Sequence, residues 1–218
     1  MSGPIAILAF GSLLDNPGAE LEPLIVKRQP VQTPFRVEFA RRSRTRAGAP
    51  TLVPVSCEGI GAFVQAQLLV LEPEVSVEQA IDMLYRRDRH LRNSSIRYDD
   101  AKARQSKNGV RIDRLEGFAG MEVVLYAALP ANLSWVLDPK LDSWVKAERL
   151  ADLAIKSVTP QTYQGDRDGI VYLERAIANG IETPLTAPYR KAILRKTGAT
   201  TLAEAREVAL RWHQEGKP

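Results

Sequence analysis

The stretch IAILAFGSLL, residues 5–14, begins as an apolar run and is interrupted by two small residues. Ile5–Phe10 predicts a buried β-strand, because a short continuous apolar run suits a strand covered on both faces. Gly11 and Ser12 end this strand where a simple hairpin would favour Asn-Gly or Asp-Gly. Small residues leave the backbone N–H groups at a strand end unshielded, and such groups can hold a carboxylate or an oxyanion. An ordinary tight turn would account for the same two residues.

Strands are predicted mainly in the first 130 residues and helices after them. The further strand candidates are Phe35–Arg41, Thr51–Ser56, Gly61–Leu71, Val110–Phe118 and Met121–Leu129. Amphipathic helices are predicted at residues 143–157, 169–180 and 201–215 from apolar residues that recur at helical spacing. Strands followed by helices are typical of an α+β fold with a sheet or barrel core.

The segment SVEQAIDMLYRRDRHLR, residues 76–92, is a predicted helix between these two regions. Ser76 and Gln79 have the spacing of a capping box, which marks a helix start. One face of the helix is apolar and contains Val77, Ala80, Ile81, Leu84, Tyr85 and Leu91. Asp88 lies on that same face. A buried carboxylate normally has a partner or a chemical task, so Asp88 either pairs with an arginine such as Arg92 or serves in a reaction.

The positive charge of the chain is concentrated in two stretches. Residues 27–46 contain seven Lys or Arg against one acid, and residues 86–114 contain ten against four, although the net charge of the whole chain is only +4. This pattern indicates a local anion site, and solvated loops are the alternative. Tyr98 is the single aromatic residue of the second stretch, so the stacking platforms of a single-strand nucleic-acid binder are missing.

Composition narrows the protein class further. Hydrophobic residues make up 44% and charged residues 26% of the chain, which favours an ordered globular protein. Cys57 is the single cysteine, and with two histidines, His90 and His213, a Cys/His zinc site is not expected. No apolar run approaches the roughly 20 residues that span a bilayer, and no basic region precedes the first apolar stretch. We therefore expect a cytoplasmic protein without a metal site or a membrane segment.

Several motifs of the chain are typical of a single protein family. Phe10-Gly11-Ser12-Leu13, at the end of the first strand, resembles the Tyr/Phe-Gly-Ser-Leu signature of the γ-glutamylcyclotransferases, particularly of the ChaC-like branch. The segment FARRSRTRAGAP is similar to a second family pattern, in which it keeps Phe39, Ser43, Gly48 and Pro50. The arginine of that pattern falls on Ala47 here, with Arg46 beside it. Arg87-Asp88 stands where the family has an Arg-Glu pair, and VLYAALPAN and GIVYLERAIANG resemble later family segments.

The resemblance implies a fold and a reaction. It implies a small mixed β-barrel with helices packed outside, in a single domain spanning residues 1–218 with a helical C-terminal extension from about residue 143. The family cleaves a small γ-glutamyl amide, such as glutathione, by attack of the substrate's own α-amine on its γ-carbonyl, which yields 5-oxoproline. No metal or other cofactor is needed, and no nucleic-acid or membrane partner is expected. The sequence indicates no oligomeric state.

The resemblance also implies roles for individual residues. Asp88 would be the catalytic carboxylate, one methylene shorter than the family's glutamate. Phe10, Gly11, Ser12 and Leu13 would bind the glutamyl group, and Ser43 and Arg46 would contribute to substrate binding. Glu116 is a second candidate for the catalytic carboxylate, because IDRLEGF resembles the L-D-x-x-E-G-Y/F motif of another branch. A catalytically silent member of the same fold, which binds an anionic ligand or a protein partner, is the alternative to an enzyme.

Overall fold

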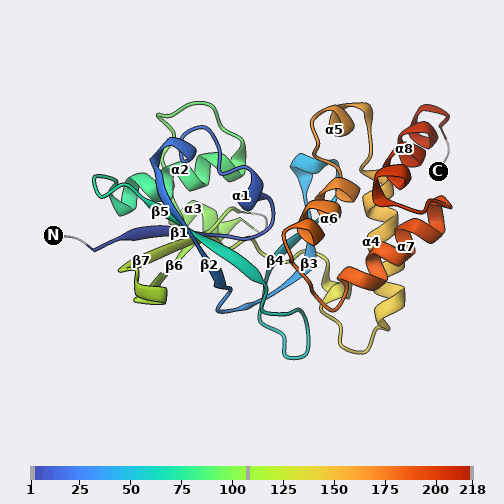
Figure 1. Cartoon of the computed structure of the whole chain (residues 1–218), viewed down its shortest axis with the longest axis horizontal. Helices are drawn as coiled ribbons and strands as arrows, with labels where there is room; N and C mark the ends of the chain where they lie inside the picture. The colour runs from blue at the N-terminus through green and yellow to red at the C-terminus, as the bar shows by residue number, and fades with distance from the viewer. Residues whose placement is uncertain (1–2, 107–108, 217–218) are drawn as a thin grey trace. The chain divides into compact units, whose positions relative to one another are not determined.

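The computed structural model describes residues 3–106 and 109–216, and the chain divides into two compact units (Figure 1). The first unit comprises residues 1–34 and 65–130, and the second comprises residues 35–64 and 131–218. The second unit therefore takes an internal segment of the chain together with everything after residue 130. The predicted helical region from residue 143 onward belongs to this second unit.

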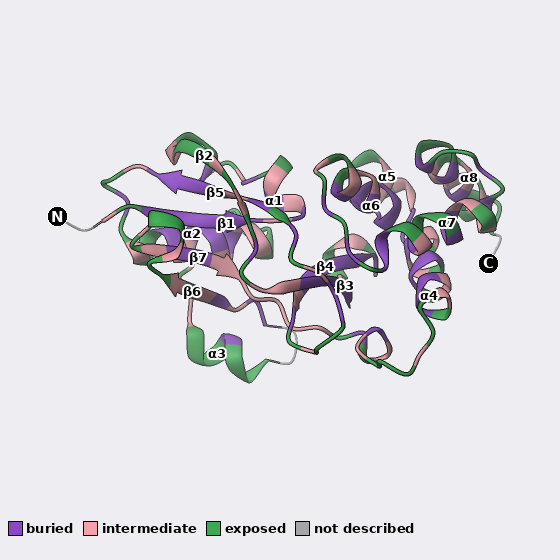
Figure 2. Cartoon of the chain, turned by 60° about the horizontal axis from the view of Figure 1, so that its bottom comes forward, coloured by how far each residue is buried: buried purple, intermediate pink, exposed green. Residues whose placement is uncertain are grey.

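A mixed β-sheet forms the centre of the first unit. Within the described residues, its five strands are β1 (Ile5–Ala9), β2 (Ile25–Gln32), β5 (Gln65–Leu71), β6 (Ile112–Glu116) and β7 (Val123–Ala127). They lie in the order β2-β5-β1-β7-β6, with β1 antiparallel to β5 and parallel to β7. Every residue of β1 is buried, as its apolar sequence predicts, and β1 and β5 are largely purple in Figure 2. The predicted α+β class is confirmed.

Helix α2 (Val77–Arg89) begins where its sequence predicts. The N–H of Gln79 donates to the Ser76 hydroxyl at 3.2 Å, and the Ser76 N–H donates to the side-chain carbonyl of Gln79 at 2.9 Å. Both bonds of the capping box are therefore present, and they satisfy N–H groups that have no acceptor inside the helix.

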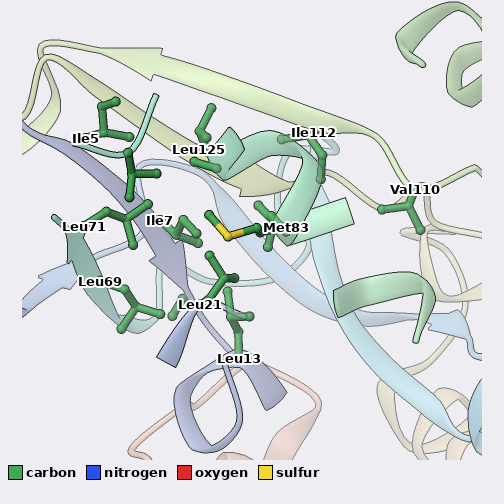
Figure 3. Packing of buried hydrophobic residues seen from close by; sticks show 14 residues of the cluster. Ile5, Ile7, Leu13, Leu21, Leu69, Leu71, Met83, Val110, Ile112 and Leu125 are labelled. Atoms are coloured by element: carbon green, nitrogen blue, oxygen red, sulfur yellow. The ribbon is translucent and has the colours of Figure 1, made fainter. Parts of the chain in front are cut away.

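One face of the sheet packs against α2 to form the core of the first unit. The β1 side chains on this face come from Ile5, Ile7 and Ala9, and those of β5 come from Leu69 and Leu71. Ala80, Met83 and Leu84 contribute from α2, and Figure 3 shows Met83 among Ile7, Leu125 and Ile112. This packing holds α2 across the sheet.

The second unit combines a two-stranded antiparallel sheet with helices. The strands are β3 (Arg36–Arg42) and β4 (Pro50–Val55). The helices are α4 (Ser143–Lys156), α5 (Pro160–Gln164), α6 (Gly169–Ala178), α7 (Thr186–Thr197) and α8 (Leu202–Gln214). The described chain from residue 143 onward forms helices and their connections without a further strand, which confirms the expected helical C-terminal part.

Four of the helices in the described residues were not predicted from the sequence. In the first unit these are α1 (Ser12–Asp15) and α3 (Asp100–Gln105), and in the second they are α5 and α7. Three of these, α1, α3 and α5, have six residues or fewer. Strand β2 was also not predicted. Half of the residues in its sequence, IVKRQPVQ, are polar, and Pro30 cannot donate to a ladder. The strand lies at the edge of the sheet, where such a residue is tolerated.

Candidate functional site

The turn after β1 requires glycine at its first position. Gly11 is buried and has φ 63° and ψ −137°, a conformation that residues with a Cβ rarely adopt. It precedes the four-residue helix α1, and no described side chain caps that helix. The first N–H groups of a helix have no acceptor within it. The small residues therefore serve a sharp strand-to-helix turn.

Asp88 lies in the last turn of α2, on the helix face that the sequence predicts to be buried. Ala80, Leu84 and Asp88 are spaced four residues apart and so share one face. Ala80 and Leu84 are fully buried, and the side chain of Asp88 is only 8% exposed. The carboxylate thus continues the core-facing stripe of the helix.

Arg87 joins Asp88 to the turn after β1. Its Nη1 donates to Asp88 Oδ1 at 2.7 Å, and its Nη2 donates to the carbonyl oxygen of Ser12 at 2.9 Å and to the Ser12 hydroxyl at 3.3 Å. The same guanidinium donates through Nε and Nη2 to the carbonyl oxygen of Asn16, at 3.0 and 2.6 Å. Asp88 and Ser12 are therefore one guanidinium group apart, although 76 positions separate them in the sequence.

A glycine makes room for this arginine. Gly18 has φ 95°, and a Cβ at this position would stand 2.9 Å from Cγ of Arg87. Such a contact is shorter than van der Waals packing allows. Arg92, the partner that the sequence suggested for Asp88, is exposed instead. Nothing in the sequence indicates that Arg87 also reaches Ser12 and Asn16, so its role as a link to the turn was missed.

Glu116, the second carboxylate candidate, lies at the other end of the sheet. It ends β6, its side chain is 72% exposed, and it pairs with Arg114 at 3.5 Å. Glu116 lies opposite Val123, which in turn lies beside Ile5 at the start of β1. Gly11 follows the end of β1, so a strand of five residues, roughly 16 Å long, separates the two positions. Asp88, not Glu116, is the carboxylate brought to the turn.

Ser43 and Arg46 lie in the second unit, in the connection between β3 and β4. The Ser43 N–H donates to Ala49 O at 2.9 Å, which closes this loop. The guanidinium carbon of Arg46 lies 5.1 Å from the ring centre of Tyr172 on α6. The Tyr172 hydroxyl also accepts from the Leu52 N–H at 3.2 Å. Two of the family-like segments are therefore in contact within the second unit, while Phe10–Leu13 and Asp88 belong to the first.

The remaining predictions from composition concern metals and membranes. No group of three or more His, Cys, Asp or Glu side chains is arranged to hold a metal ion in residues 3–106 and 109–216. The stretch GDRDG, residues 165–169, forms a turn in which Asp168 caps α6. Across the part of the chain that is described, every helix is too short or too polar to cross a bilayer.

Comparison with known proteins adds no assignment. The chain matches no protein-family model, and no curated protein and no solved structure is detectably similar to it.

Proposed function

We propose that the protein is a γ-glutamylcyclotransferase that converts a small γ-glutamyl amide, such as glutathione, into 5-oxoproline and the released amine. The observation that carries this proposal is the link between Asp88 and the Gly11–Ser12 turn through Arg87. A carboxylate and a strand-end turn whose backbone N–H groups could bind an oxyanion are the two parts that the reaction requires. In this proposal the mixed sheet of the first unit corresponds to the small barrel of the family.

The reaction moves one proton and exchanges one bond. The nitrogen of the substrate's α-amine attacks the γ-carbonyl carbon and closes a five-membered ring. The bond from that carbon to the leaving nitrogen then breaks, and the proton lost by the attacking nitrogen is gained by the leaving one. No water is consumed. Asp88 is assigned the role of taking the proton from the α-amine and returning it to the leaving group.

The turn and the arginine supply the geometry. The backbone N–H groups at Gly11–Leu13 are assigned to the γ-carbonyl oxygen, on which negative charge develops as the ring closes. Arg87 holds both the turn and the carboxylate, so the two groups keep a fixed distance before the substrate arrives. Such preorganisation removes much of the entropic cost of folding a flexible glutamyl chain for attack.

The expected contribution of Ser43 and Arg46 to substrate binding stays a prediction that kinetics can test. If Arg46 contacts a substrate carboxylate equally in the ground and transition states, Arg46→Ala raises KM and leaves kcat unchanged. The effect should weaken at high salt in proportion to the exposure of the contact. Arg44→Ala, an exposed arginine two positions away, is the matched control.

The decisive test is the formation of 5-oxoproline from glutathione and from simple γ-glutamyl dipeptides. Asp88→Asn keeps the shape of the side chain but removes the proton carrier, so it should abolish turnover while substrate binding remains. Glu116→Gln should leave turnover unchanged. Asp88→Glu, which restores the length of the family's side chain, should retain or raise the rate.

Two outcomes would contradict the assignment in different ways. Turnover that survives in Asp88→Asn and disappears in Glu116→Gln would mean that Glu116 is the catalytic carboxylate. Calorimetric binding of glutathione without 5-oxoproline formation by the unaltered protein would favour the silent, ligand-binding alternative. The ion pair at 2.7 Å between Arg87 and Asp88 supports that alternative, because it gives the carboxylate a purely structural role.

A further inference from the structure

Gln67 is a polar residue in an otherwise apolar part of β5, QAQLLVL, and the reaction described above does not use it. Its side-chain oxygen Oε1 is buried and has no hydrogen-bond partner among the described residues. Buried polar atoms in native proteins are nearly always hydrogen-bonded, so an orphaned acceptor calls for a specific explanation. Its place in the sheet supplies one.

The strand register places Gln67 at the turn. Ala9, the last residue of β1, lies directly opposite Gln67 on the antiparallel neighbour β5. Gly11 follows Ala9 by two residues. Opposed residues in antiparallel strands lie about 5 Å apart, so the Gln67 backbone borders the start of the turn.

The pleat then decides to which face Gln67 points. Alternate residues of a strand share a face, and Leu69 and Leu71 belong to the core on the α2 side of the sheet. Ala9 and Ile7, their counterparts on β1, belong to the same core. Gln67 is two residues before Leu69, so its side chain lies on the face that carries α2. Arg87 reaches the turn from that helix and binds Asp88.

The side chain of Gln67 is compatible with more than one direction of its oxygen Oε1. The last side-chain torsion of glutamine is broad, with no sharply preferred value. No described donor holds Oε1 in place. A substrate that brings an N–H group to this position would supply the missing hydrogen bond.

We propose, on the basis of the proposed function, that Gln67 is a specificity-determining residue that accepts a hydrogen bond from the N–H of the scissile amide. In the proposed reaction, the α-amine is assigned to Asp88 and the γ-carbonyl oxygen to the turn. The scissile N–H is the donor next to the reacting carbon that still lacks an acceptor. This hydrogen bond requires a secondary scissile amide, because only such an amide retains the hydrogen.

The test compares γ-glutamylalanine with γ-glutamyl-N-methylalanine, which lacks the amide hydrogen. Gln67→Leu should lower kcat/KM for γ-glutamylalanine about tenfold, the equivalent of one neutral hydrogen bond, and leave kcat/KM for the methylated compound unchanged. Intrinsic differences in reactivity between the two amides cancel when variant and unaltered protein are compared. Gln67→Leu should also raise the melting temperature, because it removes the orphaned acceptor. If the role of Gln67 were only structural, Gln67→Leu would leave the ratio of kcat/KM for the two substrates unchanged.

Gln65→Leu is the matched control, since Gln65 is an exposed glutamine of the same strand. It should change neither the ratio of kcat/KM for the two substrates nor the melting temperature.

An unchanged ratio in Gln67→Leu would overturn the role of Gln67 and leave the proposed function standing. If the unaltered protein forms no 5-oxoproline from either compound, the proposed function fails, and calorimetric binding of γ-glutamylalanine decides the role of Gln67. Tenfold weaker binding by Gln67→Leu supports that role, whereas equal binding or none overturns it.

Discussion

The guanidinium of Arg87 binds the carboxylate of Asp88, the next residue in the chain, at 2.7 Å. Consecutive residues of a helix normally point in different directions and do not face each other. Here the carbonyl oxygens of Ser12 and Asn16 hold the other nitrogens of the same guanidinium, and this fixes its position. The geometry of the ion pair therefore depends on the turn after β1 as well as on the helix.

Arg87→Lys should lower kcat strongly. A lysine ammonium is a point charge and cannot reproduce the planar set of donors that reaches Asp88, Ser12 and Asn16 together. A misplacement of about 1 Å at a reacting group can cost on the order of 10²-fold in rate. Steady-state formation of 5-oxoproline measures the effect, with Arg92→Lys as the exposed control on the same segment. Equal rates for the two variants would show that Arg87 does not position the site.

Gly18→Ala should displace Arg87 and so disturb the site, although Gly18 is not itself part of it. The new Cβ would meet Cγ of Arg87 at 2.9 Å and would also have to adopt a φ of 95°. Gly117→Ala carries a similar backbone strain, with φ 67°, but its Cβ would meet nothing within 4 Å. We expect both variants to lose about 1 kcal/mol of stability from the backbone alone. Only Gly18→Ala should also lower turnover, and equal turnover in the two variants would contradict the packing argument.

Glu38 makes the stability of the second unit dependent on pH. Its side chain is 1% exposed and accepts hydrogen bonds from the Thr183 hydroxyl at 2.7 Å and from the Phe39 N–H at 2.8 Å. Burial raises the pKa of the Glu38 carboxyl from 4.5 to about 7, against the opposing effects of these bonds, the Leu185 N–H and the nearby Lys146 ammonium. The folded state therefore binds this proton more tightly than the unfolded state.

The sign of the effect follows from that difference. The stabilisation is fully present below pH 4.5 and is lost as pH rises through about 7, for a total on the order of 3 kcal/mol. Urea unfolding should therefore show lower stability at pH 8 than at pH 5. Carboxyl groups whose pKa is lowered, such as those of Glu20 and Glu148, affect the stability mainly at pH values below this range. Glu38→Gln should flatten the dependence, and Glu182→Gln, an exposed carboxylate of the same unit, should preserve it.

Asp168 should be among the most sensitive positions for folding. It is fully buried, caps α6 through the N–H groups of Ile170 and Val171 at 3.0 Å each, and pairs with Arg206 at 2.7 Å. Asp168→Ala should cost about 3–5 kcal/mol, since it removes one partner of a buried ion pair as well as the cap. Asp168→Asn keeps a capping oxygen and should cost less.

Asp142 provides the matched control for that prediction. It caps α4 in the same way, through the N–H groups of Trp144 and Val145, but it is exposed. Asp142→Ala should therefore cost only about 1 kcal/mol, the usual value of a helix cap. Chemical denaturation of the three variants measures the order. A similar loss for Asp142→Ala and Asp168→Ala would show that the buried pair with Arg206 contributes little.

Local rules in the sequence were sufficient for the elements on which the site is built. The apolar run Ile5–Phe10 predicts β1, and the Ser76–Gln79 capping box predicts the start of α2. Helical spacing alone places Asp88 on the buried face. These features depend on residues a few positions apart, whose geometry is set by the period of a strand or a helix. The same rules fail for β2, which is half polar and contains Pro30, because its pairing with β5 is decided by a segment more than 30 residues away.

The partner of Asp88 and the orphaned oxygen of Gln67 were decided by the tertiary structure. Helical spacing favoured Arg92, four residues from Asp88, but the carbonyl oxygens of Ser12 and Asn16 recruit Arg87 from more than 70 positions away. In the sequence, Gln67 is one polar residue of a predicted strand that begins with alternating apolar and polar residues. Only its pairing with Ala9 brings it to the turn. The division of the chain into two units was likewise not visible as a linker or a change of composition. A local pattern determines which face a side chain occupies, whereas the atoms that it meets there depend on which distant segments pack against that face.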